Sequence, residues 1–78
     1  MDKSEILKKI GKRIKEVRLQ KGISQADLVG KMDGNIDPTN ISRIEAGRTN
    51  PTVITLFRIA EAMDMKLADL VNLESTEI

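Results

Sequence analysis

The sequence contains no cysteine, no histidine, no tryptophan and no tyrosine, and Phe57 is its one aromatic residue. Without cysteine the chain can form no disulfide, no thiolate zinc site and no thiol nucleophile. Without histidine it lacks the usual general base and the commonest metal ligand. A single aromatic side chain provides no stacking platform for single-stranded nucleic acid. We therefore do not expect an enzyme, and we expect no metal site and no cofactor.

The sequence also lacks a signal-peptide pattern and any long apolar run, so we expect a soluble, cytoplasmic protein with no membrane contact. Its 78 residues, with 40% hydrophobic and 32% charged side chains, are typical of one small globular domain. Such a chain has no room for a second, ligand-binding domain. No small-molecule ligand is therefore expected.

The net charge is only +1, but the charges are unevenly distributed. Residues 1–21 contain eight Lys or Arg and three acids, whereas residues 53–78 contain two Lys or Arg and five acids. A protein that presents one face to DNA would show such a gradient. A solvated amphipathic first helix would show it too, so charge alone does not decide between the two interpretations.

A long amphipathic helix is predicted from Ser4 to Lys21. Its apolar stripe consists of Ile6, Ile10, Ile14 and Val17. Gly22 fits the left-handed position that commonly follows the end of a helix. A short helix is then predicted to begin at Ser24, because Ser24 and Asp27 have the spacing of a capping box.

A second short helix is predicted from Asp37 to Ala46. Asp37 is a strong N-cap residue, and Pro38 suits the first helical position because the N–H that proline lacks would have no partner there. Gly47 fits the residue that ends the helix. Two short capped helices joined by a glycine-containing turn form the helix-turn-helix pattern.

The exposed side of this second short helix is predicted to be polar, without a carboxylate. Its side chains are Thr39, Asn40, Ser42 and Arg43. Arginine can read guanine, asparagine can read adenine, and threonine or serine can contact base edges or phosphate. We therefore predict base reading by Thr39, Asn40 and Arg43, with Ser42 as a flanking contact. The alternative is a solvated helix face with no partner.

Three blocks of the sequence resemble the Cro/C1-type (XRE-like) helix-turn-helix family of phage repressors and bacterial transcription regulators. The blocks are SQADL at residues 24–28, ISRIEAGRTNPT at residues 41–52 and LFRIAEAM at residues 56–63. The resemblance extends from Ile10 to Val71, which is nearly the whole chain. The spacing of the blocks after Ile41 is that of the family.

This resemblance implies an all-α fold: a compact five-helix, lambda-repressor-like DNA-binding domain whose third helix lies in the major groove. We assign the domain to residues 1–73 and expect residues 74–78 to fray. The resemblance also implies a salt bridge between Arg18 and Glu45 that ties the first helix to the recognition helix. It implies a phosphate contact by Gln25, which lies at the positive end of its helix.

The sequence departs from the family pattern in three places. The turn at residues 33–37 is longer than usual, which would tilt the recognition helix or loosen its entry. Pro38 stands where the family often has a polar base-reading side chain, and its ring can make only apolar contacts. Lys66 replaces the usual Ser or Thr cap, so the last helix begins less firmly.

The rest of the chain predicts two further helices, a set of phosphate contacts and a homodimer interface. Thr52 is expected to cap a fourth helix that has Val53, Leu56, Phe57, Ala60 and Met63 on one face. A short fifth helix is expected from Leu67 to Val71. The predicted phosphate or flanking contacts are Ser24, Gln25, Ser42, Arg48, Thr49 and Asn50. The predicted homodimer interface consists of Ile54, Leu67, Leu70, Val71 and Leu73.

These observations favour a sequence-specific regulator of transcription that binds double-stranded DNA. The expected form is a stand-alone dimeric repressor or controller protein that reads a palindromic operator through the helix at residues 38–46. The alternative is a helix-turn-helix protein-interaction module, such as an antitoxin, with little DNA specificity. Besides double-stranded DNA and a second copy of the chain, a protein such as RNA polymerase or a toxin is a candidate partner.

Overall fold

The computed structural model describes residues 1–32 and 36–76, which form helices and no strand. The elements are α1 (Lys3–Gln20), α2 (Gln25–Lys31), α3 (Pro38–Glu45), α4 (Val53–Ala62), α5 (Leu67–Leu70) and a final 3-10 turn, η1 (Leu73–Thr76). The predicted all-α, five-helix fold is confirmed. Residues 33–35 of the predicted long turn lie outside the described residues. Residues 77–78 of the predicted frayed tail also lie outside them. No helix in the described ranges is long and apolar enough to cross a membrane.

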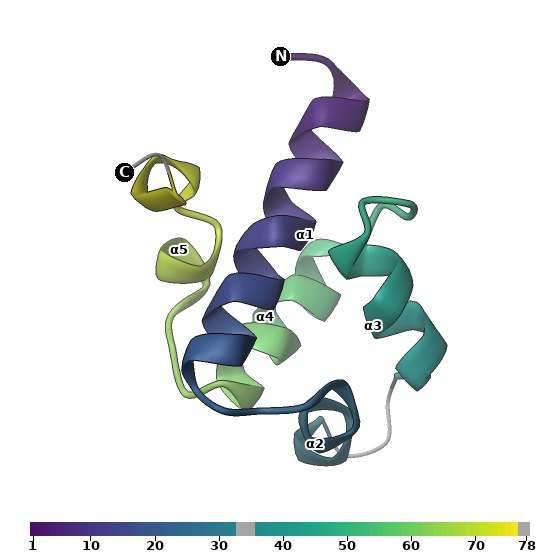
Figure 1. Ribbon diagram of the computed structural model, residues 1–78, viewed down its shortest axis with the longest axis vertical. Coiled ribbons are helices and arrows are strands. Elements are labelled where there is room, and N and C mark those ends of the chain that lie inside the picture. The colour runs from purple at the N-terminus through teal and green to yellow at the C-terminus, as the bar shows by residue number, and fades with distance from the viewer. Residues whose placement is uncertain (33–35, 77–78) are drawn as a thin grey trace.

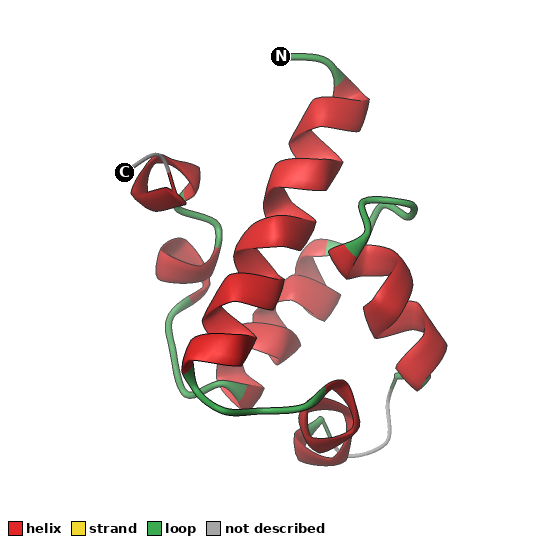
Figure 2. Ribbon diagram, viewed as in Figure 1, coloured by secondary structure: helices red, strands yellow, loops and turns green. Residues whose placement is uncertain are grey.

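The longest helix, α1, runs through the middle of the molecule, and the other helices surround it (Figure 1). Helix α3 lies on one side of α1, whereas α5 and η1 lie on the other. Helix α2 lies across the end of α1 and also contacts α3 and α4. Loops join the helices, and the one between α3 and α4 projects from the body beside α1 (Figure 2).

The core between these helices consists of aliphatic and methionine side chains, and each of the five α-helices contributes to it or to its border. Its buried hydrophobic residues are Ile14, Val17, Leu28, Met32, Ile41, Ile44, Ile59, Ala60, Met63 and Leu70. Burying one Ile or Leu side chain contributes about 1.5–3 kcal/mol. Helices as short as α2, α3 and α5 are unstable alone in water, so this shared core holds them in place.

Side-chain caps fix where α2 and α3 begin. The Ser24 Oγ accepts a hydrogen bond of 2.9 Å from the Asp27 backbone N–H, and the Asp27 carboxylate accepts one of 3.2 Å from the Ser24 N–H. These bonds hold the pKa of Asp27 below its usual value, because they favour the charged carboxylate. At α3 the Asp37 carboxylate accepts a bond of 2.8 Å from the Thr39 N–H, and Pro38 follows as the first helical residue.

The buried side of α4 differs from the predicted one. Val53 and Phe57 were expected on the packed face, but both are more than half exposed. Ile59 packs into the core instead, together with Ala60. Apolar residues occupy so many positions of this ten-residue helix that periodicity alone does not select one face.

The prediction that Leu70 contributes to a dimer interface is wrong, because Leu70 is 1% exposed and belongs to the domain's own core. Helix α5 is one turn long and lies against α1 and α4, and this contact takes up Leu70. The other three apolar residues at this end, Leu67, Val71 and Leu73, are half-buried. Lys66 provides no side-chain cap to α5.

Candidate nucleic-acid interface

Helix α3 has one buried side and one exposed side. Ile41 and Ile44 are buried and fix the helix to the core. Thr39 and Arg43 point away from the core and are exposed, and Asn40 is half-buried at the edge that faces α4. Of the three predicted base-reading side chains, the structure therefore places Thr39 and Arg43 on the exposed side of α3 and Asn40 at the edge of that side.

A buried ion pair joins α3 to α1. The Arg18 Nε donates to Glu45 Oε2 at 2.7 Å, and the Arg18 Nη2 donates to Glu45 Oε1 at 3.0 Å. The two side chains are only 7% and 4% exposed. The hydrogen bond to Glu45 raises the pKa of Arg18 above its ordinary value, and burial lowers it less, so the guanidinium stays charged. Such a two-point pair fixes the orientation of α3 as well as its position.

Two further groups complete this pair. The Arg18 Nη1 donates to the Ile23 carbonyl oxygen at 2.8 Å, which ties in the loop before α2. The Gln25 Nε2 donates to Glu45 Oε1 at 3.0 Å, which ties in the start of α2. The sequence indicated a phosphate contact for Gln25 but gave no sign of this bond. The bond uses one N–H of the Gln25 amide, which has a second.

Backbone contact between α1 and α3 is close at Gly11. A Cβ added at this buried glycine would lie 2.5 Å from the carbonyl oxygen of Glu45 and closer still to that of Ile44. No side chain therefore separates the two helices at this point. Because both neighbouring atoms are backbone, they cannot turn aside as the end of a side chain would.

The other predicted phosphate contacts lie on α3, at the start of α2 and on the loop after α3. Ser24, Ser42, Arg48 and Asn50 are exposed, and Thr49 is half-buried. Ser24 also serves as the cap of α2, and Arg48, Thr49 and Asn50 lie on the loop that leaves the end of α3 (Figure 1). These residues border the exposed side of α3 at the start of α2 and at the end of α3.

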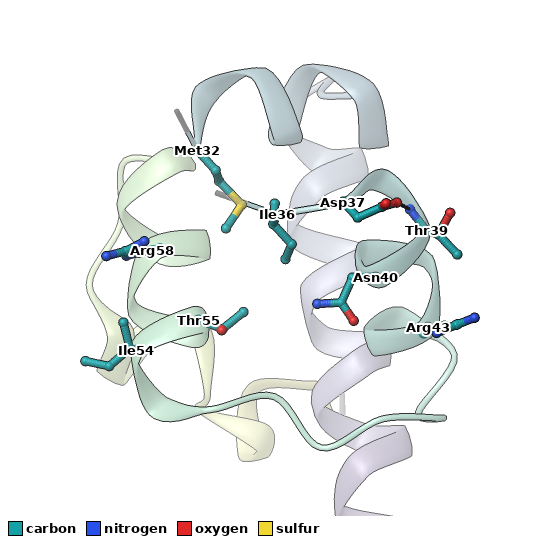
Figure 3. Close-up of a pocket in the computed structure, with 9 residues that line it drawn as sticks. All are labelled: Met32, Ile36, Asp37, Thr39, Asn40, Arg43, Ile54, Thr55 and Arg58. Carbon is teal, nitrogen blue, oxygen red and sulfur yellow. Dashed lines mark hydrogen bonds between the residues drawn. The ribbon is translucent and has the colours of Figure 1, made fainter. Parts of the chain in front are cut away.

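A hollow of about 500 Å³ separates α3 from α4 (Figure 3). Its lining residues are Met32, Ile36, Asp37, Thr39, Asn40, Arg43, Ile54, Thr55 and Arg58. Asn40 and Thr55 point into it from α3 and α4, whereas Arg43 and Arg58 stand at its two opposite sides. Ile54, predicted at a dimer interface with the C-terminal residues, also borders this hollow.

Sequence reasoning missed Thr55 and Arg58 as neighbours of the recognition helix. They follow from the way α4 packs against α2 and faces α3, which periodicity does not reveal. In the part of the chain that the structure describes, neither the Arg43 nor the Arg58 guanidinium has an ion-pair or hydrogen-bond partner. No group of three or more His, Cys, Asp or Glu among the same residues could hold a metal ion. The described residues that line the hollow therefore carry two arginines against one acid.

Comparison with known proteins agrees with this geometry. The helix-turn-helix family model HTH_3 matches residues 14–70. An uncharacterized HTH-type transcriptional regulator, y4dJ of Sinorhizobium fredii, is 31% identical over 68 residues, which cover 87% of this chain and 86% of that protein.

Two solved structures are also similar. The restriction-modification controller protein C.AhdI from Aeromonas hydrophila is 30% identical with a TM-score of 0.77, over 82% of this chain and 94% of that one. The wild-type restriction-modification controller protein C.Esp1396I is 32% identical with a TM-score of 0.77, over 92% of this chain and 96% of that one. With its capped helix pair and polar α3, the chain belongs to the Cro/C1-type helix-turn-helix family and is a DNA-binding regulator of transcription.

Proposed function

We propose that two copies of this chain form a two-fold dimer that reads a palindromic operator. Each α3 enters a major groove, so the half-sites lie one helical turn, about 34–36 Å, apart. The observation that carries this proposal is the exposed side of α3, which holds Thr39 and Arg43 with Asn40 at its edge, on a helix that a buried ion pair fixes in place. The protein acts as a stand-alone repressor or controller, and the two similar solved structures are named restriction-modification controller proteins.

Each polar group of the interface has its own role in this proposal. Arg43 contacts guanine through two hydrogen bonds, Asn40 contacts adenine, and Thr39 contacts a neighbouring base edge. The phosphate and flanking contacts are Ser24, Gln25, Ser42, Arg48, Thr49 and Asn50, which set the register of the protein on the duplex. Residues 1–73 act as one DNA-binding unit, without catalysis, in the cytoplasm.

Arg43 and Arg48 provide a direct test of this assignment. Arg43→Ala should cost about 1–3 kcal/mol of binding free energy and relax the preference at one base pair per half-site, because a guanine contact is lost. Arg48→Ala should weaken binding to all sequences about equally, because a phosphate contact carries no base preference. Selection of bound duplexes from a random pool, carried out with wild type and both variants, distinguishes these effects.

The outcomes of this selection separate the competing functions. If Arg43→Ala returns the wild-type consensus at the wild-type strength, Arg43 is not a base reader. If the wild-type protein enriches no sequence, the protein-interaction module becomes the better interpretation, with a toxin or RNA polymerase as its partner. The exposed apolar side chains of α4 would then be the surface that binds it.

The dimer proposal rests on apolar exposure along α4. Val53, Ile54 and Phe57 are 67%, 61% and 51% exposed. Phe57 lines a second hollow, between α4 and α5, together with the half-buried Leu67. Contiguous apolar surface of this kind commonly marks a protein interface.

Sedimentation at tens of micromolar protein should therefore show twice the 8.7 kDa mass of the chain. Phe57→Ser should shift this equilibrium towards the monomer, because it removes the largest exposed apolar side chain of α4. Val53→Ser tests the same face one turn earlier. A wild-type protein that stays monomeric both alone and with DNA would contradict the dimer.

A further inference from the structure

We propose that Arg58 holds a DNA phosphate and that the hollow between α3 and α4 receives one sugar–phosphate strand. This inference rests on the proposed function, because it assumes that α3 lies in the major groove. It adds a contact from α4, which is outside the helix-turn-helix, and it gives a role to a cation that the sequence did not single out.

The dimensions of a helix in the major groove place phosphates beside α3. An α-helix with its side chains is about 10–12 Å wide, and the major groove is about 12 Å wide. A helix that fills the groove therefore has one DNA strand along each flank. One flank of α3 faces the start of α2, where Gln25 bonds to Glu45. The other flank faces α4 across the hollow, where the cation of α4 is Arg58 (Figure 3).

The charges around the hollow suit a phosphate. Arg58 is exposed, and among the described residues nothing pairs with its guanidinium. Among the described residues, the one acid that lines the hollow is Asp37, and a carboxylate oxygen of Asp37 already accepts the Thr39 N–H as the cap of α3. A planar guanidinium with five N–H donors matches the oxygens of a phosphate.

Arg58 lies on the same side of α4 as Ile54, at one edge of the proposed dimer surface, because both line the hollow, whereas Phe57 of that surface faces α5. Arg58 and Thr55 line the hollow that faces α3. Phe57 lines the second hollow, next to α5, with Lys66. Loss of the Arg58 charge can be compared with loss of the Lys66 charge, because Lys66 precedes α5 and lines the second hollow instead.

The test measures how the affinity for DNA changes with salt. Arg58→Gln should make the slope of log K against log salt shallower by about 0.9 per subunit, because one phosphate contact is lost. Its affinity should fall by the same factor for the selected operator and for an unrelated duplex, and the selected consensus should stay the same. Arg58→Lys should keep the wild-type slope. Lys66→Gln, which removes the same charge, should also keep it.

Each other result overturns the inference. A wild-type slope for Arg58→Gln means that Arg58 touches no phosphate. If sedimentation shows Arg58→Gln to be monomeric where wild type is dimeric, Arg58 belongs to the dimer interface. A changed consensus would make it a base reader instead. If wild type binds no duplex, the proposed function fails together with this inference, whereas the first three results leave it standing.

Discussion

Glu45→Ala is expected to lower the free energy of unfolding by about 3–5 kcal/mol, because it leaves the buried Arg18 guanidinium without its carboxylate. Arg18 donates two hydrogen bonds to Glu45, and both side chains are less than a tenth exposed. Gln25 loses its partner in the same substitution. A domain of this size has a total stability of order 5–15 kcal/mol, so the loss removes much of it.

Thermal and urea unfolding measure this loss. In a domain of this size, a change of 1 kcal/mol shifts the melting temperature by about 4–8 °C, so the expected shift is more than about 12 °C. Glu16→Ala is the matched control, because Glu16 makes only a 4.0 Å contact to the exposed Lys12. It should change the stability by less than about 1 kcal/mol.

A second variant separates an unpaired charge from lost packing. Adding Arg18→Met to Glu45→Ala removes the stranded guanidinium, so the double variant should be more stable than Glu45→Ala alone. If Glu45→Ala melts within a few degrees of wild type, the ion pair contributes little to folding. If the double variant is less stable than Glu45→Ala, loss of packing around Arg18 is the larger effect.

The sequence predicted best what depends on neighbouring residues. The cap bonds of Ser24 and Asp37, the proline at the start of α3 and the left-handed Gly22 all arise within a few residues of chain. Their geometry is set by local hydrogen bonds and sterics, which tertiary packing did not change here. The positions of α2 and α3 therefore followed from the sequence to within a residue or two.

What depends on packing was predicted less well. The bond from Gln25 to Glu45 was not predicted, because Glu45 lies twenty residues away and meets Gln25 only when α2 packs against α3. Leu70 was expected at the surface because α5 is short, yet α1 and α4 bury it. Arg58 was not singled out, because no spacing within α4 shows which of its sides faces α3.

Gly11→Ala is expected to lower the free energy of unfolding by about 3 kcal/mol or more, at the upper end of what overpacking costs. In a helix, glycine is usually a disadvantage of about 1 kcal/mol relative to alanine, so propensity alone predicts the opposite sign. The added Cβ would overlap the carbonyl oxygens of Ile44 and Glu45. The overlap is relieved only if α1 and α3 move apart, which also stretches the ion pair between Arg18 and Glu45.

Gly30→Ala is the matched control for this substitution. Gly30 also lies in a helix, but a Cβ added there meets nothing within 4 Å, so the same change should be neutral or stabilise by up to about 1 kcal/mol. Urea unfolding of both variants compares the steric overlap at Gly11 with the gain in helix propensity that both substitutions share. If the two variants have equal stability, α1 and α3 do not approach as closely as described. Opposite signs would show that the recognition helix is positioned by direct backbone contact with α1.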